Sequence, residues 1–78
     1  MPRYRATRDF AAKELSGGSW RIIAPDEELI FIRWMGEQDK QSAIFAVAIK
    51  DPQRSSNLGP LYEVERELFE ASTEAIWA

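Results

Sequence analysis

The sequence predicts a small α+β protein, in which an antiparallel meander of three or four strands is covered on one face by a C-terminal helix. Two apolar runs rich in β-branched and aromatic residues flank a polar loop in the middle of the chain, as in a β-hairpin. The last part of the chain instead carries apolar side chains at helical spacing. With 78 residues, the chain fits one domain, residues 1–78, near the lower size limit for a stable core.

The predicted hairpin comprises residues 28–35 and 42–50. If its strands pair symmetrically about the loop, Phe31, Met35 and Ile44 share one face. Both faces of the hairpin are largely apolar and therefore need covering. Because a single helix cannot easily cover both, we expect a homodimer, with Phe31, Met35 and Ile44 or their counterparts on the opposite face as contacts.

Residues 19–24 predict a further strand that precedes the hairpin. Pro25 and Asp26 suit the two central positions of a tight turn, which would lay this strand antiparallel beside the hairpin. The register is ambiguous by one residue. We favour the one that places Trp20 and Ile22 in a common aromatic core.

The N-terminal segment is consistent with two structures. Residues up to about Thr7 alternate in the manner of a half-exposed strand. Residues 9–16 suit either more strand or a short N-terminal helix, with Asp9 as N-cap and Gly17 or Gly18 beyond its end.

Residues 61–77 predict the C-terminal helix, with Pro60 suited to its first turn. Its apolar side chains cover about half of the helical wheel, enough to dock on a sheet. The opposite side carries a stripe of four like charges, which repel one another at these spacings. The stripe consists of Glu63, Glu67, Glu70 and Glu74.

The glutamate stripe has three interpretations. It is a docking face for a basic protein surface, a solvated face that keeps the chain soluble, or a set of partners for arginines near the N-terminus. Trp77, on the polar side of the same wheel, either folds back onto the sheet or anchors a partner. For the docking interpretation the candidate partner-binding residues are Glu63, Glu67, Glu70, Glu74 and Trp77.

The composition excludes several kinds of chemistry. The chain has no cysteine and no histidine, so it lacks thiolate ligands, the commonest transition-metal ligand and the usual general base. No phosphate-binding loop or calcium loop occurs, and we expect no catalysis, no cofactor and no metal. No apolar stretch approaches the length of a membrane span, and a cytoplasmic location is the default expectation.

These observations favour a non-catalytic protein-binding module, acting as a small acidic regulator or inhibitor of the antagonist, antitoxin or immunity type. Some phage-encoded antagonists of this character block a nucleic-acid-binding protein by presenting carboxylates in place of phosphates. The alternative is nucleic-acid binding through Arg3 and Arg5 on a basic N-terminal strand. A net charge of −3 makes nucleic acid the less favoured partner.

Overall fold

The computed structural model describes residues 2–48 and 59–77 and, for Trp77, only the backbone. The described residues form seven strands and one short helix, so the predicted α+β fold class is wrong. In chain order the elements are β1 (Arg3–Ala6), β2 (Phe10–Glu14), β3 (Trp20–Ile23), β4 (Glu28–Glu37), β5 (Lys40–Val47), β6 (Leu61–Glu65), α1 (Arg66–Ser72) and β7 (Thr73–Trp77).

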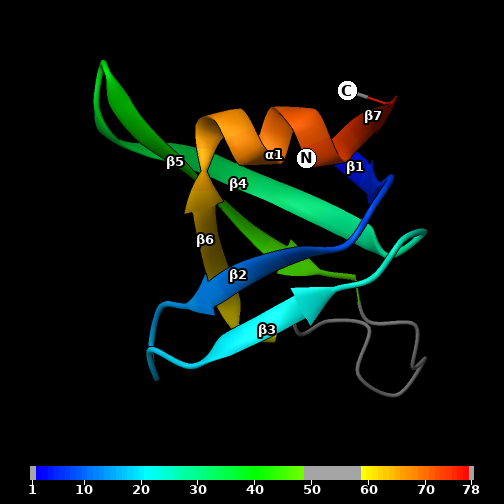
Figure 1. Ribbon diagram of the computed structural model, residues 1–78, viewed down its shortest axis with the longest axis horizontal. Coiled ribbons are helices and arrows are strands. Elements are labelled where there is room, and N and C mark those ends of the chain that lie inside the picture. The colour runs from blue at the N-terminus through cyan, green and yellow to red at the C-terminus, as the bar shows by residue number, and fades with distance from the viewer. Residues whose placement is uncertain (1, 49–58, 78) are drawn as a thin grey trace.

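The strands form one antiparallel sheet in the order β3-β2-β6-β5-β4-β1-β7. This sheet curls into a half-barrel, with α1 lying across its upper end in Figure 1. The first and last strands, β1 and β7, lie side by side. Among the described residues β3 and β7 are the two edge strands, because each pairs with a single neighbour.

The concave face of the half-barrel holds the hydrophobic core. Along β2, Phe10 and Ala12 are buried and point inward, whereas Lys13 is exposed, the period of two that a half-buried strand requires. A row of aromatic side chains directly opposite one another crosses three strands on this face. It consists of Phe31 on β4, Phe45 on β5 and Tyr62 on β6.

The central hairpin is present as predicted, but its pairing contains an irregularity. Trp34 pairs with Ala43 and Arg33 with Ile44, as symmetric pairing requires. The register then shifts between Phe31 and Arg33, and Phe31 pairs with Phe45. A bulge of this kind reverses the face to which the side chains on its far side from the turn point, here those of Phe31 and the residues before it. It brings Phe31 into the core.

Of the two structures left open for residues 9–16, the strand is the one that forms and the possible short helix is wrong, because residues 10–14 form β2. Its expected C-cap glycines instead belong to the turn between β2 and β3, where Gly18 has a φ of 71°. Glu14 N donates to Ser19 O at 2.8 Å and closes this hairpin. Strand pairing on both sides of β2, to β3 and β6, outweighs the weak helix signal.

The strand at residues 20–23 exists, but the predicted meander with β4 is wrong. Among the described residues, β3 pairs with β2 alone. The segment after Pro25 is held against the end of β1, because Asp26 N donates to Ala6 O at 2.8 Å and Ala6 N donates to Glu27 O at 3.0 Å. These two bonds direct the chain into β4 beside β1 and leave β3 at the far edge.

The predicted C-terminal helix over residues 61–77 is also wrong. Only Arg66–Ser72 is helical, and strands β6 and β7 flank it. Tyr62 and Val64 are both buried, a two-residue period that fills the core beside β5. The helix ends where Thr73 becomes extended and its Oγ1 donates to Phe69 O at 2.7 Å.

Phe69 is the helical side chain that closes the core. It is 1% exposed, and its ring lies 5.0 Å from Tyr4 and 6.0 Å from Phe31. Its ring also lies 6.0 Å from Trp34 and 5.9 Å from Phe45, measured between ring centres. Phe69 therefore joins β1, β4 and β5 to the helix.

We expect Phe69→Ala to lower the free energy of unfolding by about 3–5 kcal/mol, since it leaves a cavity among four aromatic rings. Urea denaturation followed by circular dichroism measures this change. The matched control is Leu68→Ala on the same helix, where Leu68 is 37% exposed and a loss below about 1 kcal/mol is expected. Equal losses for the two variants would contradict the role assigned to Phe69.

Candidate functional site: the outer groove

The convex face of the sheet carries a continuous row of side chains across five strands. The paired positions are Arg33, Ile44, Glu63, Lys13 and Trp20, on β4, β5, β6, β2 and β3 in that order. Residues directly opposite one another in an antiparallel sheet point to the same face. The row therefore runs from an exposed arginine over the buried Ile44, through a pair of opposite charges, to an exposed tryptophan at the sheet edge.

A depression of about 340 Å³ lies at the β3 end of this row. Trp20 lines it and is 69% exposed, and Leu68 of α1, also in its lining, is 37% exposed. Lys13, Glu63 and Glu65 supply the charged part of its lining. Exposed apolar side chains and charged groups are thus brought together by β2, β3, β6 and α1.

A second depression, of about 840 Å³, lies between α1 and the turn that joins β4 to β5. Its lining is polar: Gln38, Asp39, Lys40, Gln41, Ser42, Glu65, Arg66, Glu67 and Glu70. The turn itself is tight because Gly36 has a φ of 108°, and a Cβ at that position would meet Lys40 O.

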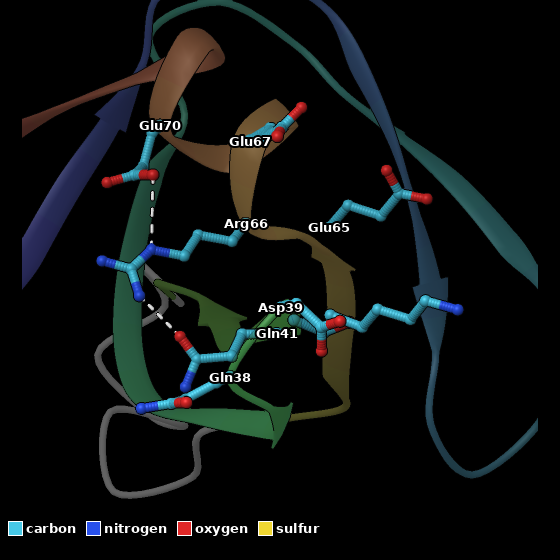
Figure 2. A pocket seen from close by; sticks show the side chains of 9 residues that line it. Gln38, Asp39, Gln41, Glu65, Arg66, Glu67 and Glu70 are labelled. Carbon is cyan, nitrogen blue, oxygen red and sulfur yellow. Dashed lines mark hydrogen bonds and ion pairs between the residues drawn. The ribbon is translucent and has the colours of Figure 1, made fainter.

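Arg66 occupies the middle of the second depression and is held from three sides. Figure 2 shows it between Glu70 of the helix and Gln41 of the hairpin. Its Nη1 donates to Gln41 Oε1 at 2.5 Å, and its Nε lies 3.4 Å from Glu70 Oε1. The guanidinium carbon lies 4.5 Å from the centre of the Trp34 ring, a cation–π contact. Arg66 thereby fastens α1 to the hairpin.

The two depressions meet at Ser42 and Glu65, which line both. We call the combined surface the outer groove. Its lining holds five acidic and three basic side chains, a formal charge of −2. The acidic members are Asp39, Glu63, Glu65, Glu67 and Glu70, and the basic members are Lys13, Lys40 and Arg66.

No family model matches the chain, and no curated protein or solved structure matches it significantly. The function is therefore inferred from the groove itself.

The structure brings three of the four stripe glutamates to the outer groove, although not on one helix. Glu63 lies on β6 in the first depression, and Glu67 and Glu70 lie on α1 in the second. Glu74 lies on β7, where its Oε1 is 3.5 Å from Arg5 Nη1. The backbone of Trp77 pairs with Arg3, but its side chain lies outside what the structure describes.

Arg3 and Arg5, the residues of the nucleic-acid alternative, both form ion pairs. Arg3 is bonded to Glu28 on β4 and Arg5 to Glu74 on β7. Both pairs are partly exposed. An approaching phosphate would have to compete with these carboxylates, so the arrangement does not favour the alternative.

The three residues expected at a dimer contact do not share one face. Met35 and Ile44 point to the convex face, whereas the bulge in β4 turns Phe31 into the core. Ile44 is only 2% exposed within the single chain. The homodimer itself stays a prediction, and this set of residues offers little accessible apolar surface for it.

Sequence reasoning missed the most exposed large apolar residues of the groove and its edge. Trp20 was expected in the core, and Ile22, at its side on β3, is 62% exposed. Residues 20–23 do alternate in the sequence, with Trp20 and Ile22 on one face of the strand and Arg21 and Ile23 on the other, and only Ile23 is buried. Deciding which of the two faces points to the core required knowing that β3 pairs with β2.

Two further findings concern the described residues as a whole. In residues 2–48 and 59–77 no cluster of three or more acidic side chains has the arrangement of a metal site. Within the same ranges no helix has the length and apolar character needed to span a membrane.

We expect Arg66→Ala to lower the free energy of unfolding by about 1 kcal/mol, because it removes the cation–π contact and the bond to the hairpin together. Urea denaturation measures this change. The matched control, Glu70→Gln, removes only the exposed ion pair on the helix and should cost below about 0.5 kcal/mol. A larger effect for Glu70→Gln would show that Arg66 does not fasten the helix.

Proposed function

We propose that this protein is a non-catalytic protein-binding module that engages a basic protein surface through the outer groove. One observation carries the proposal: a largely exposed tryptophan stands on an ordered strand at the end of an acid-rich groove. Tryptophan is one of the side chains enriched at binding hot spots. The nearby carboxylates supply charge complementarity.

The groove has the layout of a binding surface with one apolar and one acidic end. Trp20 and Leu68 lie at the β3 end, and Glu67 and Glu70 lie at the far end on α1. Strands β3 and β6 are two strand spacings apart, so Trp20 and Glu63 are separated by roughly 10 Å across the sheet. A complementary partner presents an apolar side chain and, at about that distance, a lysine or arginine.

The exposure of the groove carboxylates does not favour catalysis. Reactive groups in enzymes are held in sites from which water is excluded. Glu65, Glu67 and Glu70 are exposed on the surface of the chain. Such carboxylates suit long-range attraction of a basic partner better than proton transfer.

The proposed role is that of a small regulator or inhibitor. A rigid surface of carboxylates can occupy a protein site that otherwise binds phosphates, because carboxylates and phosphates both present oxygen acceptors and negative charge. A cytoplasmic site of action belongs to the same proposal, because a chain without cysteine needs no oxidising compartment to fold.

The test is a selection of phage-displayed random peptides on the immobilised chain. We expect enriched peptides to combine basic with apolar or aromatic residues. Their affinity should fall about tenfold for the Glu63→Gln/Glu67→Gln variant and for Trp20→Ala, and should weaken with salt.

The matched control is Glu28→Gln/Glu74→Gln, which also removes two negative charges, but from residues outside the groove. It should change peptide affinity less than about threefold, because it leaves the groove intact. It also releases Arg3 and Arg5 from their ion pairs. A failed peptide selection, together with oligonucleotide binding that this variant strengthens, would replace the proposal with nucleic-acid binding.

A further inference from the structure

Edge strand β3 has an unusual composition for a strand without a second neighbour. Within the described residues it pairs with β2 only. Natural edge strands are commonly protected by charged side chains or bulges. β3 instead directs the side chains of Trp20 and Ile22 to the convex face, where they are 69% and 62% exposed.

The backbone of the same two residues faces the unpaired side. Because Glu14 N donates to Ser19 O, these two residues form a hydrogen-bonded pair, and the pairs of the β2–β3 ladder alternate from there. Arg21 and Ile23 therefore bond to β2. The N–H and C=O groups of Trp20 and Ile22 point away from β2, toward the side on which none of the described strands lies.

This edge is complementary to itself. Suppose that a second β3 runs antiparallel, with the two Arg21 residues opposite each other. Trp20 of each copy then lies opposite Ile22 of the other, which gives two equivalent pairs. All four outward N–H and C=O pairs then become hydrogen-bonded. The indole and the aliphatic side chain also meet on the same face, an arrangement that stabilises antiparallel pairs.

The two opposed arginines do not prevent this pairing. Arg21 Nη2 lies 3.0 Å from Glu27 Oε1, and its Nη1 donates to the Tyr62 hydroxyl at 3.3 Å. The hydrogen bond to Tyr62 is the main cause that raises the pKa of Arg21, and Glu27 adds to it. Each guanidinium therefore brings its own carboxylate, which offsets the repulsion between the copies.

The other edge, β7, is less suited to pairing with a copy of itself. Its partner β1 has a register irregularity between Arg3 and Tyr4. Glu74 on β7 is engaged by Arg5. Charge and irregular pairing are features that protect an edge.

We propose that the chain forms a two-fold homodimer by antiparallel pairing of β3 with β3 of a second copy, centred on Arg21. A four-residue strand gives a contact only about 13 Å long. Interfaces this small are weak, so the dimer forms only at high protein concentration. The dimer goes beyond the proposed partner binding, because it shares Trp20 with the groove but uses none of the groove carboxylates.

Sedimentation equilibrium of the full chain from about 10 µM to 1 mM tests the dimer over the range where such a contact forms. The decisive pair of variants is Ile22→Pro and Ile22→Ala. Both remove the aliphatic side chain, but only proline removes the outward N–H, which takes no part in the β2 ladder. We expect proline to weaken dimerisation at least about tenfold more than alanine.

A cysteine variant tests the same register without relying on the fold of the proline variant. Directly opposed positions in an antiparallel pair bring Cβ atoms to about 4.5–5.5 Å, near the distance for a disulfide. Because the chain has no native cysteine, Arg21→Cys should form a disulfide-linked dimer under mild oxidation, whereas Leu15→Cys in the neighbouring turn should not.

A wild-type chain that stays monomeric at 1 mM would overturn the proposal. So would a dimer that Ile22→Pro and Ile22→Ala weaken equally, or crosslinking that is as efficient at Leu15 as at Arg21. Peptide binding by the groove has its own readout, the loss of affinity in Glu63→Gln/Glu67→Gln. That variant leaves β3 unchanged, so failure of one proposal is distinguishable from failure of the other.

Discussion

The insertion of Phe69 into the open end of the half-barrel is the contact on which the rest of the structure depends. A curled sheet buries its concave face only if something closes the open end. Phe69 does so by meeting aromatic rings from β1, β4 and β5. To bring it there, the chain must leave β6, form about two helical turns, roughly 10 Å long, and re-enter the sheet as β7 beside β1.

The same requirement places the acidic side chains of this segment. On β6, Tyr62 and Val64 must point inward, so Glu63 and Glu65 point to the convex face. On α1, Phe69 takes the inward position, and Glu67 and Glu70 remain exposed. The acidic side chains that β6 and α1 bring to the outer groove are therefore those that the core excludes.

The groove and the edge of β3 are adjacent and share Trp20. Its side chain lines the groove and would also meet Ile22 of a second copy, whereas the backbones of these two residues supply the hydrogen bonds at the edge. Strands that pair edge to edge in one sheet keep their convex faces on the same side. A dimer through β3 would thus present two acidic grooves to one partner, and two linked contacts bind more tightly than one.

The sequence by itself determined the strands whose pattern is local. The β4–β5 hairpin was predictable because two β-rich runs flank a short polar loop, and so was the strand at residues 20–23. Composition likewise limited the chemistry, since neither cysteine nor histidine is present. The acidic character of residues 63–70 was also visible. Three of the four predicted stripe glutamates do line the groove.

Only the tertiary structure decided how the remaining segments pair. Residues 61–77 carry both a helical and an alternating pattern, and the choice depends on β5 and β2 offering edges to β6 and on β1 offering one to β7. Trp20 faces solvent because β3 pairs with β2 and not with β4. These are pairings between residues far apart in the chain, and strand preference is set by such neighbours more than by the residues themselves.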